Sequence, residues 1–213
     1  MLPLRASGDF AMTFKTRNAA MAALAIAVAL ASAAGVTIRA QAADPSGYGA
    51  DGRLAFPKDY REWVFLSSGL GMAYTPGPAG GSPAFTNVFV NPEAYAAFQK
   101  TGTWPDKTMM VLEIRASGQN ASINKQGHFQ TARQGVSVHV KDQSRFKGGW
   151  AFFAFNGEGP GQLLPQSAPC YSCHEAHAAV DTTFTQFYPT LLPIAQAKKT
   201  LSPAYLAEEA KRR

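Results

Sequence analysis

The sequence predicts an α+β protein with a mainly antiparallel β-sheet and flanking helices. Nineteen Gly and fourteen Pro among 213 residues argue against a helical bundle. Residues 135–142 alternate strictly, with Val136, Val138 and Val140 on one face, which is typical of a half-buried strand. Residues 91–93 are Asn-Pro-Glu, a combination that is typical of a helix start. Short strands with local connections favour an antiparallel sheet on which helices pack.

The first half of the predicted fold holds short strands on either side of one helix. The helix is expected from Pro92, with Asn91 as its N-cap. Gly102 ends it, because glycine readily adopts the left-handed conformation of a helix C-cap. Lys107 lies in the turn that follows, and its side chain is expected to point to solvent. A short helix or strand is expected at residues 60–66, and strands are expected at 87–90 and 108–115.

The second half of the fold is expected to begin with an irregular segment and to end in helices. Residues 118–135 are polar and predict no regular structure. Residues 150–155 are apolar on both faces, as in a central strand. From 173 to 197 the pattern becomes helical, with proline breaks. Ser202 before Pro203 predicts the cap of a last short helix.

The first 42 residues are expected to be a secretory signal peptide. Arg5, Lys15 and Arg17 form a positive region, and an uncharged run of small apolar residues follows at 19–35. Residues 40–42 are Ala-Gln-Ala, a small-x-small cleavage site. A membrane anchor is the alternative, but an Ala-rich run of 17 residues is short for a membrane span. Export to the periplasm is therefore expected.

Three parts of the chain follow from this division. Residues 1–42 are the signal peptide, 43–56 a loose N-terminal segment and 57–213 the folded domain, with Met12 as an alternative start to Met1.

The chain carries 20 Lys and Arg against 14 Asp and Glu, a formal charge of +6. These bases are scattered rather than clustered along one stripe, so no nucleic-acid partner is expected.

The two cysteines form a motif with a specific chemistry. Residues 170–174 are Cys-Tyr-Ser-Cys-His, the attachment signature of c-type haem. Cys170 and Cys173 would each add to a haem vinyl group, and His174 would ligate the iron. A redox dithiol is one alternative, but it calls for a βαβ context. Half a zinc site is another, but no further cysteine completes four ligands. One covalently attached haem c, near the C-terminus, is therefore expected.

Four blocks of sequence give the chain a family resemblance. In order and spacing they are similar to the cytochrome P-460 family, which includes the cytochromes c′-β. The resemblance extends over residues 57–192, and its blocks are residues 60–64, 88–102, 140–152 and 170–189. It implies a mainly antiparallel β fold with flanking helices, a single haem c, a five-coordinate iron with an open distal face, and a homodimer.

One residue departs from the family pattern. In the family members that oxidise hydroxylamine, a Pro-Asp-Gly-Thr turn precedes a strand. A lysine on that strand is covalently linked to the haem edge. Leu112 stands at that position here, and leucine has no nucleophile with which to form the link. The resemblance therefore implies that Leu112 covers the haem with an apolar surface, as in the c′-β branch. Strand alternation then turns Glu113 away from the haem.

Other candidate residues have both a functional and an ordinary interpretation. His139 could reach the haem, but alternation with the valines favours solvent. His177 is expected on the same side of the haem ring as His174, which favours a surface role. His128 is expected in solvent. Two roles are possible for Met72, Met109 and Met110: a thioether sulfur that ligates the iron, or ordinary packing in the core. Two roles are also possible for four basic residues, which could pair with the haem propionates or lie solvated at the surface: Arg61, Arg115, Lys141 and Arg145.

Three functions are compatible with these residues. The first is a mono-haem protein that binds a small gaseous or nitrogen-oxide ligand, or exchanges one electron with a periplasmic redox partner. The second is an enzyme that oxidises hydroxylamine or nitric oxide at the same iron. The third is a six-coordinate electron carrier with Met or His as the second axial ligand. An apolar distal pocket disfavours anionic intermediates, so gas binding ranks above catalysis.

Overall fold

The computed structural model describes residues 47–49, 51–74 and 81–212. The predicted signal peptide at 1–42 lies outside these residues. Within the described ranges, none of the helices has the length and apolar character that crossing a bilayer requires.

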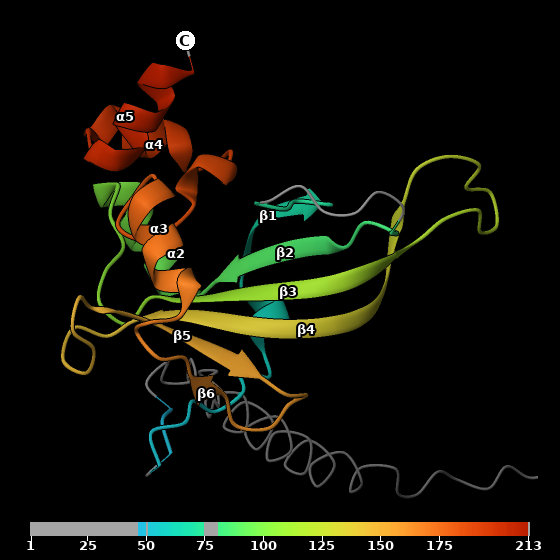
Figure 1. Cartoon of the computed structure of the whole chain (residues 1–213), viewed down its shortest axis with the longest axis horizontal. Helices are drawn as coiled ribbons and strands as arrows, with labels where there is room; N and C mark the ends of the chain where they lie inside the picture. The colour runs from blue at the N-terminus through green and yellow to red at the C-terminus, as the bar shows by residue number, and fades with distance from the viewer. Residues whose placement is uncertain (1–46, 50, 75–80, 213) are drawn as a thin grey trace, which may run out of the picture. The chain divides into compact units, whose positions relative to one another are not determined.

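Across the described ranges, six antiparallel strands form one sheet in which spatial order equals chain order (Figure 1). Each strand is hydrogen-bonded to the next, as short local connections allow. The strands are β1 (Val64–Leu70), β2 (Phe85–Val90), β3 (Met109–Gly118), β4 (Phe129–Lys141), β5 (Trp150–Phe155) and β6 (Gln162–Leu163). Together with the helices, this sheet confirms the predicted α+β class.

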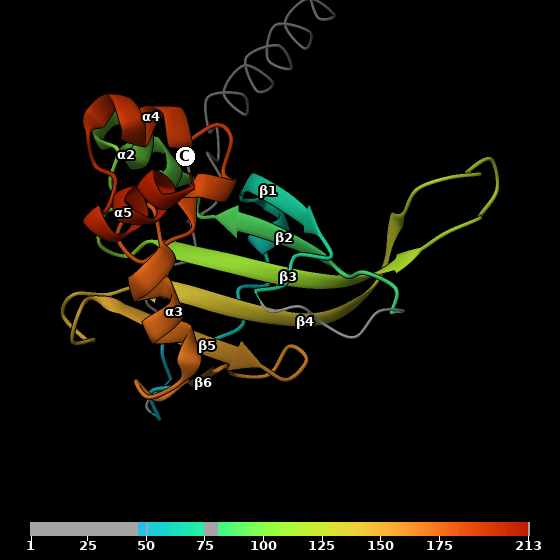
Figure 2. The same ribbon diagram turned by 45° about the horizontal axis from the view of Figure 1, so that its top comes forward.

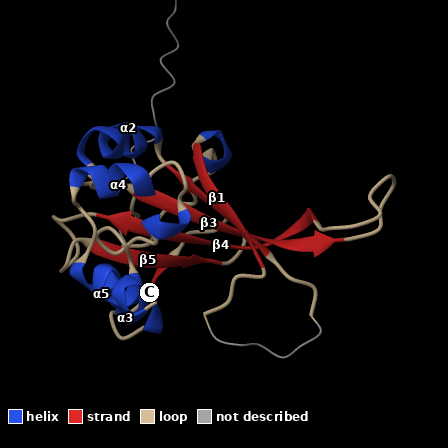
Figure 3. Cartoon of the chain, turned by 90° about the horizontal axis from the view of Figure 1, so that it is seen from above, coloured by secondary structure: helices blue, strands red, loops and turns tan. Residues whose placement is uncertain are grey.

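The helices gather at one end of the sheet, and β3 and β4 extend from the other end as a hairpin (Figures 2 and 3). Two 3₁₀ turns accompany four α-helices in the described part of the chain. The elements are η1 (Tyr60–Glu62), α2 (Pro92–Thr101), α3 (Pro169–His177), η2 (Thr185–Phe187), α4 (Leu192–Lys198) and α5 (Pro203–Lys211).

Two helix boundaries follow the sequence signals. Gly102 ends α2 at φ 75°, in the left-handed region. Ser202 caps α5, where its hydroxyl accepts a hydrogen bond from Tyr205 N at 3.1 Å. Asn91 precedes α2 as expected, but its side chain does not cap the helix. Its Oδ1 accepts from Met109 N at 2.8 Å instead, which ties the start of α2 to β3.

One local prediction is wrong, and another is only partly right. Residues 129–135 were expected to be irregular, but they form the first half of β4, paired with β3. This part of the hairpin projects beyond the other strands, so it shows no apolar alternation. Lys107 points to solvent only in part: its side chain is 40% exposed, and its Nζ lies 2.7 Å from Oδ2 of the buried Asp142. Its φ of 64° shows that the chain turns there as a glycine would allow.

Apolar side chains pack on both faces of the sheet. One cluster joins the helices to the sheet and includes Phe98 and Trp104, whose ring centroids lie 4.2 Å apart. The other covers the opposite face and includes Phe153. Leu54 and Phe56 belong to this second cluster, and Leu54 also bridges to Gly161. The segment at 43–56 was expected to be loose, and its described C-terminal part is instead packed against the sheet.

Replacing Phe153 with Ala should destabilise the fold strongly. Phe153 is 0% exposed, and deleting a buried aromatic ring costs about 3–5 kcal/mol in the free energy of unfolding. Urea unfolding followed by circular dichroism measures this loss. Phe65→Ala is the matched control, because Phe65 is 53% exposed and should cost less than about 1 kcal/mol. Equal losses in the two variants would contradict the two-cluster core.

Candidate functional site

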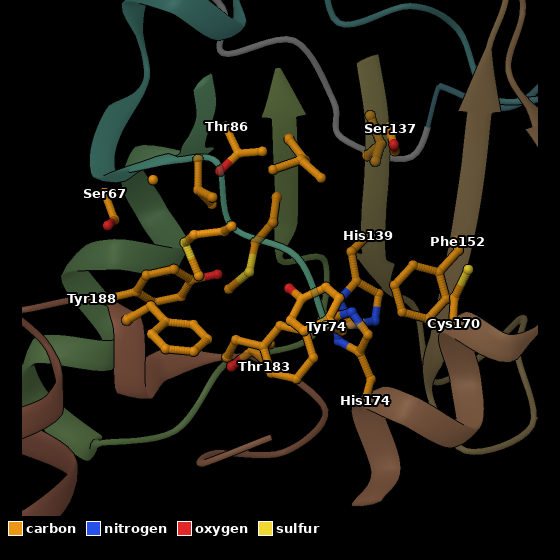
Figure 4. A pocket seen from close by; sticks show the side chains of 18 of the residues that line it. Ser67, Tyr74, Thr86, Ser137, His139, Phe152, Cys170, His174, Thr183 and Tyr188 are labelled. Atoms are coloured by element: carbon orange, nitrogen blue, oxygen red, sulfur yellow. The ribbon is translucent and has the colours of Figure 1, made fainter. Parts of the chain in front are cut away.

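A pocket of about 290 Å³ lies between one face of the sheet and the segment from α3 to η2 (Figure 4). This volume is near the lower end of the range for small-molecule sites, about 300–1,000 Å³. Met72, Tyr74 and Phe187 belong to its lining and are 42%, 69% and 42% exposed. The pocket is therefore open on this side, where a large planar group could extend. No Asp, Glu, Lys or Arg is among the described residues that line it.

Strand register produces the wall of this pocket. A first row of cross-strand neighbours is apolar or small and consists of Ser67, Val88, Leu112, Ser137 and Ala154. A second row consists of Met110, His139 and Phe152. Because the rows lie two residues apart along each strand, their side chains share one face. The structure thus places Leu112 in the pocket wall, between Val88 and Ser137.

Helix α3 presents Cys170 and His174 to the pocket. Pro169 occupies its first turn, where a missing N–H costs nothing. Cys170 and His174 are four residues apart and therefore lie on the same helix face. Both line the pocket, and Cys173 is partly buried beside them. The two thiols are not joined in a disulfide.

His174 is hydrogen-bonded at one ring nitrogen, and the other has no hydrogen-bond partner among the described residues. Its Nδ1 lies 2.6 Å from the main-chain oxygen of Thr182, which can only accept, so Nδ1 carries the proton. Phe184 packs against the ring at a centroid distance of 4.1 Å. Burial lowers the pKa of His174, and the Thr182 hydrogen bond opposes this only in part. The ring is therefore neutral at pH 7, with Nε2 available as a metal ligand.

The segment that supplies the Thr182 carbonyl is itself fixed by the core. Thr183 Oγ1 accepts a hydrogen bond from Trp104 Nε1 at 2.8 Å. Lys141 Nζ lies 3.0 Å from Asp181 Oδ2, and Asp181 has a φ of 51°. Sequence reasoning missed Thr182 and Trp104 as supporting residues. The motif at 170–174 gives no signal for either residue. Thr182 lies outside the regular elements, and Trp104 is distant from Thr183 in the sequence.

His139 is buried in the pocket wall, so the expectation that it faces solvent is wrong. It is 7% exposed, and its ring stacks on Phe152 at 4.0 Å and 8° (Figure 4). The strand alternates as predicted, but α3 covers the face that was assigned to water. Burial, and then the neighbouring His174, hold the pKa of His139 well below its usual value.

The distance between the two histidines bears on iron coordination. Their ring centroids lie 5.1 Å apart, at 72°. Two imidazoles on opposite sides of one metal would be roughly 6 Å apart, since each metal–nitrogen bond is about 2 Å. His139 Nε2 and His174 Nδ1 also both lie against Thr182, which places His139 beside His174.

The remaining candidates divide between the pocket and other regions. Met72 and Met110 line the pocket, whereas Met109 lies in the opposite core cluster. His177 is exposed, as expected, and its Nδ1 lies 3.0 Å from Glu208 Oε2. His128 contacts Gln119 on the β3–β4 hairpin. Four basic residues do not line the pocket: Arg61, Arg115, Lys141 and Arg145.

Glu113 faces away from the pocket, as the alternation predicted. It is 3% exposed on the opposite face of the sheet, where its carboxylate accepts hydrogen bonds from Tyr60, Asn87 and Arg115 and pairs with Arg61. Burial alone would raise the pKa of this carboxyl, but these donors outweigh it and lower the pKa below its usual value. Glu113 is therefore a structural carboxylate and not a proton donor at the pocket.

Replacing Glu113 with Gln should flatten the acid dependence of stability. The folded-state pKa lies below the unfolded-state value of about 4.3, so the unfolded chain takes up this proton first as the pH falls. Its contribution is complete at neutral pH and is lost through about pH 4 and below. Glu113→Gln should cost about 1–3 kcal/mol at pH 7 and much less at pH 3.5.

Urea unfolding at the two pH values measures this change. Glu158→Gln is the control, because Glu158 pairs with Arg133 at the surface and should contribute little. A loss in Glu113→Gln that is the same at both pH values would contradict the ionised state of Glu113.

The two alternatives for the cysteine motif find little support in this geometry. The described residues contain no group of three or more His, Cys, Asp or Glu side chains arranged to hold a bare metal ion, so half a zinc site finds no second half among them. The strand before α3 is the two-residue edge strand β6, and the sheet is antiparallel throughout. That is not the βαβ setting of a redox dithiol.

The donor set does fit a haem of the c type. Such a group needs two thiols at this spacing and one neutral imidazole, because the porphyrin supplies the other nitrogen ligands. Cys170, Cys173 and His174 provide them beside an open, mainly apolar pocket. The fold and the site thus define a c-type haem protein with a β-sheet scaffold.

Comparison with known protein families agrees with this class. The family model of Cytochrome P460 matches residues 57–185, which is more than half of the chain. The chain belongs to the cytochrome P460 family, and this membership implies a haem c. A search among curated proteins found no match.

Proposed function

We propose that this protein is an exported mono-haem c cytochrome with a five-coordinate iron, which binds small diatomic ligands such as nitric oxide or carbon monoxide, exchanges single electrons, or does both. The observation that carries the proposal is the geometry of His174, one of the two histidines that line the pocket. His174 donates its Nδ1–H to the Thr182 carbonyl, which leaves Nε2 as the ligand for the iron. His139 and His174 both contact Thr182, so His139 lies beside the proposed ligand and is not assigned as a second one.

The residues of the chain have distinct parts in this proposal. Cys170 and Cys173 hold the group through two thioether bonds, and His174 ligates its iron. When bound, the haem supplies an iron atom with one position open to an external ligand. Leu112 and Val88 exclude water from the wall of the pocket. The hydroxyls of Ser67 and Thr86, on the side of β1 and β2, can donate hydrogen bonds to a bound ligand (Figure 4).

Catalysis on hydroxylamine or nitric oxide is the second candidate. It needs proton transfer at the iron, which a positioned acid or base usually provides. Glu113 is on the other face of the sheet, and the described pocket lining holds no carboxylate or lysine. Leu112 also lacks the amine of the hydroxylamine-oxidising members. These observations favour ligand binding over catalysis.

A six-coordinate electron carrier is the third candidate. The thioethers of Met72 and Met110 are the axial sulfurs that the described lining offers. Met110 is paired with His139 across β3 and β4, and His139 lies beside His174. Met110 is therefore on the same part of the pocket wall as His174, and not opposite it. Met72 is therefore the thioether to test.

Export and partners form the rest of the proposal. Residues 1–42 direct the chain to the periplasm, where a redox partner would exchange electrons with the haem. The family resemblance favours a homodimer. Sedimentation of the purified protein tests the oligomeric state, and N-terminal sequencing of the exported product tests cleavage after Ala42.

Absorption spectroscopy distinguishes the three candidates. The reduced protein is expected to give a high-spin haem c spectrum that carbon monoxide shifts. A low-spin reduced spectrum that carbon monoxide leaves unchanged in the wild type, and that becomes sensitive to it in Met72→Leu, would support the six-coordinate carrier instead. Turnover of hydroxylamine with an electron acceptor would support the enzyme.

A further inference from the structure

We propose that His139 is a positioning residue for His174: with Thr182 it fixes the proton and the ring orientation of the iron ligand, and so sets the Fe–N bond strength and the reduction potential. This inference rests on the proposed haem site at His174. Groups that hydrogen-bond a ligating histidine orient its ring and raise its basicity. A more basic ligand stabilises the oxidised iron and lowers the reduction potential.

Thr182 connects the two histidines through two different atoms. Its main-chain oxygen accepts the Nδ1–H of His174 at 2.6 Å. Its hydroxyl Oγ1 lies 3.4 Å from His139 Nε2, a long hydrogen bond. Because both atoms belong to one residue, His139 restrains the carbonyl that holds the His174 proton. Thr182 lies between α3 and η2. Its neighbours Asp181 and Thr183 are held by Lys141 and Trp104, and His139 adds a contact to Thr182 itself.

His139 also fills the space beside the ligand ring. It lies between Trp150, at 4.3 Å, and Phe152, at 4.0 Å between ring centroids. Phe152 in turn contacts His174 at 4.7 Å. The histidine, its neighbour and the ligand therefore form one packed aromatic group in which a change at His139 reaches His174 directly.

The chemical nature of this position points to a polar role. An imidazole between two aromatic rings is costlier to bury than a phenyl ring, because its nitrogens lose water. An apolar ring would satisfy the packing equally well. What the imidazole adds is a nitrogen directed at the Thr182 hydroxyl, which is the contact that leads to the iron ligand.

Two pairs of variants test this role in the haem-loaded protein. His139→Phe keeps an aromatic ring and removes the nitrogen, while His139→Gln keeps a polar atom near the same place. Thr182→Val removes the hydroxyl but keeps the carbonyl, and Thr182→Ser keeps both. The readouts are the Fe–His stretching frequency of the reduced protein, by resonance Raman spectroscopy, and the midpoint potential. Haem content and thermal unfolding confirm that each variant is folded and loaded.

His139→Phe and Thr182→Val should lower the stretching frequency and raise the midpoint potential. His139→Gln and Thr182→Ser should stay close to the wild type, which a purely space-filling role for His139 would not produce. Wild-type values in both His139→Phe and Thr182→Val would overturn the inference. If His139→Phe does not fold, Thr182→Val decides. A wild-type protein without haem would instead overturn the proposed function, so the two failures are distinguishable.

Discussion

A chain in which both Cys170 and Cys173 are replaced by Ser is expected to carry no covalently bound haem. Thioether formation consumes the two thiols, and the sequence holds no other cysteine that could replace them. Both thiols are partly buried on the helix that borders the pocket, and they are not paired with each other. The measurement is peroxidase staining of a denaturing gel, after export from a host that matures c-type cytochromes. Complete loss of the stain is expected.

Three further variants make this result specific. Each single replacement, Cys170→Ser or Cys173→Ser, should retain one thioether and therefore a weaker stain. Ser172→Ala is the matched control within the same motif, because the Ser172 hydroxyl bonds only to Pro169 O among the described contacts and is exposed. It should stain like the wild type. A stained band from the double variant would show that the motif does not carry the haem.

Replacing His174 with Ala is expected to remove the protein ligand from the iron. The Fe–His stretching band of the reduced protein should disappear, because the described pocket lining offers no second imidazole in a position to replace it. Imidazole added at millimolar concentration should restore a band, since the deleted side chain leaves a cavity of its own shape. Resonance Raman spectroscopy of the haem-loaded fraction makes both measurements.

His177→Ala provides the control for this variant. His177 lies on the same helix, three residues further on, but it is exposed and pairs with Glu208. Its removal should leave the stretching band unchanged. If His177→Ala abolished the band and His174→Ala preserved it, the ligand would be misassigned.

Local signals were predictable from the sequence because neighbouring residues create them. Gly102 ends α2 and Ser202 caps α5 through contacts within a few residues. The alternation at 135–142 correctly separated the valine face from the face of His139. The same reasoning placed Leu112 and Glu113 on opposite faces of β3, which the pocket and the buried carboxylate confirm.

The remaining features depend on contacts between distant segments. Alternation shows that His139 lies opposite the valines, but not that α3 covers that face. Asn91 resembles a helix cap in sequence, yet the backbone of Met109 reaches its side chain first. Thr182 has no motif, since its role is performed by a main-chain carbonyl that any residue carries. Such contacts become visible only once the chain is folded.

The intact mass of the denatured, exported protein tests the central claim most directly. Unfolding releases any group that is held by packing or by an iron–nitrogen bond alone, whereas thioether bonds survive it. The expected result is the mature polypeptide plus the mass of one haem, shifted to the bare polypeptide in the Cys170→Ser, Cys173→Ser double variant. A wild-type protein at the bare polypeptide mass, produced in a host that attaches haem to other c-type cytochromes, would contradict it.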